Sequence, residues 1–298
     1  MPTNIQENVL PIEGSGRVLA RHDGRIGGIL AEDGKLGVGD IERVLELQEL
    51  EGLRFGEAAL RLSLITADDL RRAVAKQYGL PHLLLGDESI GGELVAAREP
   101  FHPRAEELRA LRTQLLIRWS SAGIRRRVLA VVSPGPGEGR SYVAANLAVL
   151  FSQLGERTLL IDADLRAPRQ HRIFNIPDRI GLSAVLSGRA DRGAVVPVSE
   201  FGSLSLLPAG ACPPNPQELL LRPSFAALLD ELCIDFDVIL FDTPPAKLYA
   251  DAQSLAFRAG SVMVLARKDH TRLADATSVI RGLSDTGARI IGTVFNAF

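Results

Sequence analysis

The sequence is poor in residues that build covalent or metal-bound frameworks. Among its 298 residues there are two cysteines, Cys212 and Cys233, and five histidines. None of them has the C-x-x-C or H-E-x-x-H spacing that is typical of zinc sites. A disulfide framework needs more cysteines, so the composition excludes a small disulfide-stabilised fold and favours a reducing compartment.

Long apolar runs and an excess of charge are also missing. No stretch of 18 consecutive apolar residues occurs, and the first 20 residues lack the basic and then apolar pattern of a secretory signal. Lys and Arg (34) nearly balance Asp and Glu (36), which gives a net charge of −2. No general attraction to nucleic acid or anionic lipid follows from this balance. We therefore expect a cytoplasmic protein that binds no nucleic acid and reaches the inner membrane only through a partner.

The chain is long enough for about two domains, and 46% of its residues are hydrophobic, as in ordinary globular proteins. Periodicity disappears where glycine and proline accumulate, after the first 80 residues. We expect an N-terminal arm (1–22), a small helical repeat domain (23–85), a linker or extended strap (86–103) and a larger α/β domain (104–298).

Two copies of a 24-residue pattern lie near the N-terminus. RIGGILAEDGKLGVGDIERVLELQ begins at Arg25 and RFGEAALRLSLITADDLRRAVAKQ begins at Arg54, and the copies align without a gap. Each copy predicts a short helix, a loop and a second helix. Thr66 and Asp69 predict a capping arrangement in the second copy. The pattern alone also fits an ordinary helical domain with solvated arginines.

R-[IF]-G at the start and Gln at the end of both copies resemble the N-terminal domain of type II secretion and pilus-assembly ATPases, which binds cyclic di-GMP. Guanidinium groups can pair with phosphate or stack on guanine. The resemblance implies ligand contacts from Arg25, Gly27, Leu30, Ile41, Leu45, Gln48, Arg54, Gly56, Leu60, Leu70 and Gln77. The second copy has Ser63 for Gly34 and Val74 for Leu45. A degenerate domain kept for protein contacts is therefore the alternative.

A glycine loop joins an apolar run to a helical stretch in the second half of the chain. RVLAVVS (127–133) precedes PGPGEGRS (134–141), and YVAANLAVLFSQLG follows. In a strand, loop and helix of this order, loop amides and the helix N-terminus point at phosphate oxygens. The pattern predicts a nucleotide-binding loop formed by Gly135, Pro136, Gly137, Glu138, Gly139, Arg140, Ser141 and Tyr142.

Carboxylates follow two further apolar runs. TLLIDADLR places Asp162 at a strand end and Asp164 two residues later, and DVILFDTPP ends a strand at Asp242. A dinucleotide-binding fold also has an acidic residue about 20 residues after its glycine turn. The G-x-G-x-G spacing and three carboxylates favour a magnesium-nucleotide site instead. Near-continuous apolar strands predict a parallel sheet covered on both faces, with ligands at the carboxyl ends of its strands.

A helix is predicted over 104–119, before the first strand. Glu106, Arg109 and Arg112 stand at i, i+3 and i+6 and so share one side of it. Such residues usually form a solvated charged face, and exposed pairs add little stability. The alternative is a contact surface for a neighbouring molecule.

Residues 104–298 resemble the catalytic domain of bacterial tyrosine kinases, relatives of the MinD/ParA ATPases. The motifs that carry the resemblance are SPGPGEGRS, LLIDADLR, PAGACPPNPQELL (208–220) and ILFDTPP. It implies a P-loop NTPase fold: a mostly parallel sheet with helices on both faces, preceded here by the helical repeat domain. It also implies ATP as substrate, with Mg²⁺ held by Ser141, Asp162 and Asp242.

The same resemblance implies catalytic roles for Asp162, Asp164 and Arg140, with Asp164 as the base for a tyrosine hydroxyl and Arg140 on the β and γ phosphates. E-x-x-R-x-x-R (Glu106, Arg109, Arg112) resembles the family's oligomerisation motif and implies a homo-oligomer. Members of the family work beside a membrane protein that determines polysaccharide chain length and activates them. These expectations describe a tyrosine autokinase of exopolysaccharide polymerisation and export.

Departures from the family pattern leave other functions open. Arg140 replaces the usual lysine, and the chain holds only Tyr78, Tyr142 and Tyr249, with no tyrosine cluster at its end. Guanidinium is wider and planar, so phosphate binding survives this change more easily than transfer does. The alternatives are a regulatory module that binds ATP and cyclic di-GMP and, third, a MinD-like positioning ATPase, against which Gly135 argues because relatives have lysine there.

Overall fold

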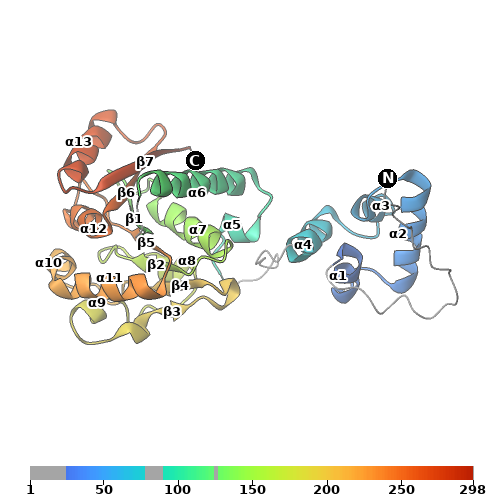
Figure 1. The fold of residues 1–298 in the computed structure, drawn as a ribbon, viewed down its shortest axis with the longest axis horizontal. Coiled ribbons are helices and arrows are strands. Elements are labelled where there is room, and N and C mark those ends of the chain that lie inside the picture. Colours follow the sequence, from blue (N-terminus) through green and yellow to red (C-terminus); the bar gives the residue numbers. More distant parts are fainter. Residues whose placement is uncertain (1–24, 78–89, 124–126, 298) are drawn as a thin grey trace, which may run out of the picture. The chain divides into compact units, whose positions relative to one another are not determined.

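The computed structural model describes residues 25–77, 90–123 and 127–297. The chain divides into two units, residues 1–80 and residues 81–298 (Figure 1). The expected arm at 1–22, the first part of the expected linker and Tyr78 lie outside the described residues.

The described part of the N-terminal unit forms two helix pairs, one from each copy of the repeat. The pairs are α1 (Ile26–Glu32) with α2 (Val38–Glu51), and α3 (Phe55–Arg61) with α4 (Ala67–Gln77). Their apolar sides share one core, in which α1 contacts both α3 and α4. Each copy therefore has the predicted order of helix, loop and helix.

The two copies repeat the same local geometry. The Gly37 N–H donates to Asp40 Oδ2, and the Thr66 N–H donates to Asp69 Oδ2, both at 3.0 Å. The Asp69 N–H returns a bond to Thr66 Oγ1 (3.1 Å), which completes the predicted capping arrangement. Hydrogen bonds from Thr66 lower the pKa of Asp69 to about 2. The replacement of a glycine by Ser63 leaves the backbone turn unchanged, because Ser63 keeps a positive φ of 53°.

The larger unit is built on a sheet whose described strands have the order β3-β4-β2-β5-β1-β6-β7. All neighbouring strands are parallel except β3, which runs antiparallel to β4. The strands are β1 (Arg127–Val132), β2 (Thr158–Asp162), β3 (Val196–Pro197), β4 (Leu204–Leu207), β5 (Val238–Asp242), β6 (Ser261–Arg267) and β7 (Arg289–Asn296).

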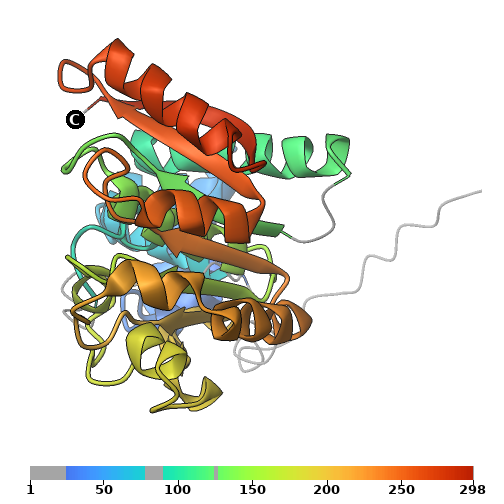
Figure 2. The same cartoon turned by 90° about the vertical axis from the view of Figure 1, so that its left-hand side faces the viewer.

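Both faces of the sheet are buried, because successive strand residues point to opposite sides and both sets are apolar. In β1, Leu129 and Val131 join the core beneath α6 and α7, while Val128 and Ala130 join the core beneath α11, α12 and α13. Figures 1 and 2 show these helices on the two sides of the sheet. The predicted fold, a mostly parallel P-loop sheet covered on both faces, is confirmed.

The helices of this unit are α5 (Val95–Arg98), α6 (Pro103–Ser121), α7 (Arg140–Ser152), α8 (Gln170–Ile173), α9 (Leu182–Leu186), α10 (Pro216–Leu221), α11 (Pro223–Asp235), α12 (Asp251–Ala259) and α13 (Leu273–Ser284), with 3-10 turns at Arg192–Ala194 and Ser199–Phe201. Among the described residues, no helix is long and apolar enough to cross a lipid bilayer.

Residues 90–103 pack onto this unit as a strap across α7. The Ala96 N–H donates to Asn146 Oδ1 (2.9 Å), and Asn146 Nδ2 donates to the Glu93 carbonyl (3.0 Å). Apolar side chains of the strap join the core on the α7 side. This part of the segment 86–103, which we expected to be a linker or strap, therefore belongs to the core of the larger unit.

The PAG motif that begins at Pro208 fits closely against the start of α9. The Leu182 N–H donates to the Pro208 carbonyl (2.8 Å). A Cβ atom on Gly181 would lie 2.2 Å from that carbonyl oxygen, and Gly210 has a positive φ of 74°. The glycines at 181 and 210 therefore serve a close backbone contact.

Candidate nucleotide site

The glycine loop lies between β1 and α7, at the carboxyl edge of the sheet. Gly137 and Gly139 have φ values of 69° and 97°, which other residues rarely adopt, and Gly139 is the N-cap of α7. The Glu138 side chain is buried inside the loop, where Oε2 accepts the Gly135 N–H (2.7 Å) and Oε1 accepts the Thr271 hydroxyl. Glu138 therefore braces the loop.

Arg140 is turned toward the loop's own backbone. Its Nε donates to the Thr243 carbonyl (2.8 Å), and its Nη1 donates to the Gly135 carbonyl (2.5 Å) and to Ser133 Oγ. The side chain is buried, which lowers the pKa of Arg140, while Asp242 and two other acids act in the opposite direction. The guanidinium donates its hydrogen bonds to the loop and to the segment after β5, and so it stabilises the loop. The sequence did not indicate this role.

Two carboxylates meet at the ends of neighbouring strands. Asp162 ends β2 and Asp242 ends β5, and the two are register partners. Their relative exposures are 0% and 1%. Burial, above all, and mutual repulsion raise the pKa of Asp162, and burial raises the pKa of Asp242. A hydrogen bond from the Ser141 side chain acts in the opposite direction on the Asp242 pKa.

Gln170, at the start of α8, connects the two carboxylates. Its Nε2 donates to Asp242 Oδ2 (2.8 Å) and to the Ser141 carbonyl (3.1 Å), and its backbone N–H donates to Asp162 Oδ2 (2.9 Å). The Arg169 N–H also donates to Asp162 Oδ2 (3.0 Å). Sequence reasoning missed Gln170, because a single glutamine after a strand carries no recognisable signal.

The donor set fits a hard divalent cation. Among the described residues, Asp162 Oδ1, Asp242 Oδ1 and Gln170 Oε1 are buried without a hydrogen-bond partner. Unpartnered buried oxygens are costly, and an oxygen-seeking ion such as Mg²⁺ would satisfy them. No group of three His, Cys, Asp or Glu residues is arranged for a metal in the described ranges. A cation here would therefore draw further oxygens from Ser141, water and phosphate.

Asp164 lies on the turn that follows β2. Its Oδ1 accepts the N–H groups of Arg166 (3.1 Å) and Ala167 (2.9 Å). The Arg166 Nε donates to Asp251 Oδ2 (2.6 Å), and Asp251 is only 1% exposed. The turn that carries the expected base is therefore held by its own amides and by the ion pair from Arg166 to the buried Asp251.

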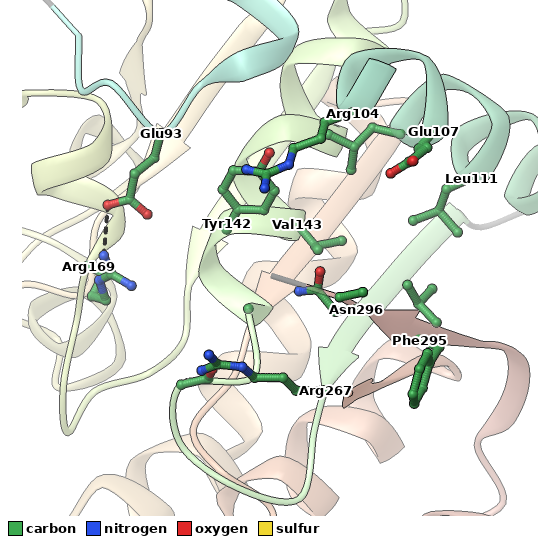
Figure 3. A pocket seen from close by; sticks show the side chains of 15 residues that line it. Glu93, Arg104, Glu107, Leu111, Tyr142, Val143, Arg169, Arg267, Phe295 and Asn296 are labelled. Atoms are coloured by element: carbon green, nitrogen blue, oxygen red, sulfur yellow. Dashed lines mark hydrogen bonds and ion pairs between the residues drawn. The ribbon is translucent and has the colours of Figure 1, made fainter. Parts of the chain in front are cut away.

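A cavity of about 800 Å³ opens beside the glycine loop (Figure 3). Gly137 and Gly139 border it, together with apolar side chains from α6 and β7 and the half-buried Tyr142, whose pKa is raised by burial. Figure 3 shows Arg169 in one wall, paired at 2.8 Å with Glu93 of the strap. An apolar wall next to loop amides and cationic side chains suits a nucleotide.

The three charged residues on α6 have different surroundings. Arg109 Nη1 lies 2.9 Å from Glu106 Oε2, and the Glu106 side chain is 75% exposed. Arg112 Nη1 instead donates to the Leu150 carbonyl on α7 (2.8 Å), and burial lowers the pKa of Arg112. One hydrogen-bond donor of Arg112 is therefore occupied by a carbonyl of its own chain.

The residues expected to contact cyclic di-GMP divide into exposed and packed groups. Arg25 and Arg54 are exposed N-caps of α1 and α3. The packed residues are Leu30 and Ile41, buried in the core, and Gly27 and Gly56, which face Phe55 and Leu70, respectively. Leu45 and Gln77 are exposed, and Gln48 and Leu60 are half-buried.

Replacing Asp162 by asparagine tests whether the buried pair is a cation site. A raised pKa makes the metal-free chain less stable as pH rises from about 4 through that pKa, because the folded state then loses its bound proton. At neutral pH without Mg²⁺, we expect Asp162→Asn to raise the melting temperature by about 2–4 °C, which corresponds to about 1 kcal/mol. Mg-ATP should stabilise the parent but not the variant.

The matched control is Asp237→Asn, because Asp237 immediately precedes the strand that Asp242 ends. Arg157 pairs with it and lowers its pKa, so this substitution should not stabilise the chain at neutral pH. A lower melting temperature for metal-free Asp162→Asn, or equal stabilisation of variant and parent by Mg-ATP, would contradict the assignment.

Comparisons with known proteins agree with this geometry. The ParA family model, described as NUBPL iron-transfer P-loop NTPase, matches residues 125–297. Tyrosine-protein kinase YwqD of Bacillus subtilis is 37% identical over 204 residues, which cover 68% of this chain and 85% of YwqD. The crystal structure of the chimerical protein CapA2B2 has a TM-score of 0.65 at 30% identity, and the match covers 76% of this chain and 97% of that chain.

A longer relative matches only in part. The putative tyrosine-protein kinase EpsB of Ralstonia solanacearum is 37% identical over 207 residues, which are 70% of this chain and 27% of EpsB. The match thus spans about a quarter of the length of EpsB. The glycine loop, the paired strand-end carboxylates and the similarity to YwqD over most of its length lead to one conclusion: this chain belongs to the bacterial tyrosine kinases, within the ParA type of P-loop NTPases.

Proposed function

We propose that the chain is an ATP-dependent protein-tyrosine kinase that phosphorylates itself or a partner during exopolysaccharide polymerisation and export. The observation that carries this proposal is the buried Asp162 and Asp242 pair, with two unpartnered oxygens next to the N-terminus of α7. A pair of this kind fits Mg²⁺, which neutralises charge on the β and γ phosphates when it is bound. Ser141, Asp162 and Asp242 would hold the ion.

The remaining roles follow from the turn geometry. Amides around Gly137 and Gly139 would hold the phosphates at the start of α7. Asp164 would accept the proton of the tyrosine hydroxyl, while the amides bonded to its Oδ1 keep the carboxylate in place. The apolar wall of the cavity would take the base of the nucleotide.

A regulatory module is the second candidate function, and the bonds of Arg140 favour it. A side chain tied to the Gly135 and Thr243 carbonyls is not available to follow a phosphoryl group during transfer. Such a chain would bind Mg-ATP tightly and transfer phosphate poorly. It would act through assembly on its partner.

Arg140→Lys separates the two candidates. Lysine places a mobile point charge near the phosphates, so we expect transfer to a tyrosine-containing copolymer to rise by about tenfold or more, a barrier lower by about 1.4 kcal/mol. The measurement is the initial rate with radiolabelled Mg-ATP.

The matched control for this measurement is Arg157→Lys. Arg157 forms an exposed ion pair with Asp237, so its replacement should leave the transfer rate unchanged. The kinase proposal fails if neither the parent nor Arg140→Lys transfers phosphate while both bind Mg-ATP. That result would leave the regulatory module.

We also propose a cytoplasmic location, a membrane-embedded chain-length determinant as activating partner, and a homo-oligomer. Similarity to the tyrosine-protein kinase YwqD over most of its length supports the kinase to which these expectations belong. The exposed Glu106 and the adjacent Arg109 remain the candidates for the contact between copies, because Arg112 bonds to its own α7.

Cyclic di-GMP is proposed as a ligand that binds the N-terminal unit and gates the kinase. The support is the repeated backbone geometry, which puts two exposed arginines, Arg25 and Arg54, at equivalent helix starts. Guanidinium groups at such positions suit a symmetric dinucleotide with two phosphates.

Calorimetry with cyclic di-GMP tests this ligand on the full chain. We expect the parent to bind, and the double variant Arg25→Ala, Arg54→Ala to lose binding at least about tenfold, because each arginine would contribute a charged contact. Arg43→Ala, which removes an exposed arginine outside the expected contact set, is the control and should bind as the parent does. No heat with the parent would remove the gating proposal and leave the kinase proposal intact.

A further inference from the structure

Tyr249 lies on the loop that connects β5 to α12, and Arg166 connects it to the turn that carries the candidate base. Its side chain is 36% exposed. The guanidinium carbon of Arg166 lies 4.1 Å from the centre of its ring, which is a cation–π contact. The residue is therefore partly accessible to solvent, and its ring packs against the Arg166 side chain.

Arg166 links this ring to Asp164. Its backbone N–H donates to Asp164 Oδ1 (3.1 Å), and its side chain forms a two-pronged pair with Asp251 at 2.6 and 3.2 Å. Because Asp251 is almost fully buried, the guanidinium has little freedom. The side-chain bonds to Asp251 raise the pKa of Arg166. Arg166 therefore contacts Asp164 through its backbone, and Asp251 and the Tyr249 ring through its side chain.

The other described tyrosine has a different environment. Tyr142 is half-buried in the wall of the cavity, and burial raises its pKa. A ring that forms the cavity wall cannot approach a nucleotide's terminal phosphate as an incoming substrate does. Tyr78 lies outside the described residues.

We propose that Tyr249 is an acceptor of the chain's own phosphotransfer, an inference that rests on the proposed kinase function. The phenolic oxygen of Tyr249 forms a bond to the γ phosphorus, and the bond from that phosphorus to the β,γ-bridging oxygen breaks. ADP leaves with the electrons of the broken bond, and the phenolic proton passes to the carboxylate of Asp164. The products are ADP and a tyrosine phosphate monoester.

The surroundings of Tyr249 also suit the product. A phosphorylated tyrosine carries close to two negative charges at neutral pH. The Arg166 guanidinium already covers the ring, and its N–H groups can donate hydrogen bonds to phosphate oxygens. The phosphate would then compete with Asp251 for Arg166, next to the turn that carries Asp164.

Peptide mapping of the full chain after incubation with radiolabelled Mg-ATP tests the proposal. The parent should carry phosphate on Tyr249, and Tyr249→Phe should lower self-labelling at least about fivefold while it keeps the aromatic ring. Tyr78→Phe is the matched control and should label as the parent does. Each protein is also assayed on a copolymer of glutamate and tyrosine.

The copolymer separates this inference from the function beneath it. Two results would overturn the assignment of Tyr249 while the kinase proposal is kept, provided that the copolymer is phosphorylated. One is undiminished self-labelling in Tyr249→Phe, and the other is phosphate mapped only to other tyrosines. Absence of label on both the chain and the copolymer, in the parent and in Arg140→Lys, would overturn the kinase proposal and this inference together.

Discussion

Repulsion between two buried carboxylates is the constraint around which the carboxyl edge of the sheet is arranged. Asp162 and Asp242 end neighbouring strands and are almost inaccessible to water. The amide of Gln170, the start of α8 and the charge of Arg140 all act on this pair. Each of these groups offsets part of the free-energy cost of burying two acids. A cation bound at the carboxylate oxygens that lack hydrogen-bond partners would offset the remaining cost.

Arg140 has a second effect, because the same side chain that adds positive charge near Asp242 also fixes the glycine loop. Its N–H groups donate hydrogen bonds to backbone carbonyls on the loop and on the segment after β5. A lysine would make fewer such bonds and keep a movable charge. The loop of this chain is therefore braced from within by Arg140 and Glu138.

Much of this edge could be predicted from the sequence, because apolar runs that end in aspartate, with a glycine loop before a helix, have one common structural solution. The repeat was equally readable, down to the cap formed by Thr66 and Asp69. Gln170 could not be found, because its role depends on three groups brought together by the sheet. A linker or strap was expected at 86–103, but the bonds that fix residues 90–103 to Asn146 on α7 could not be predicted, because Asn146 lies far away along the chain.

Anomalous diffraction from crystals of the full chain, grown with Mn²⁺ and a non-hydrolysable ATP analogue, tests the central claim most directly. Mn²⁺ shares the preference of Mg²⁺ for oxygen ligands, and its anomalous signal marks its position. The account predicts a peak between Asp162, Asp242 and the Ser141 hydroxyl, with phosphate oxygens completing its coordination. A nucleotide bound with the metal elsewhere, and with both carboxylates still without a cation, would contradict it.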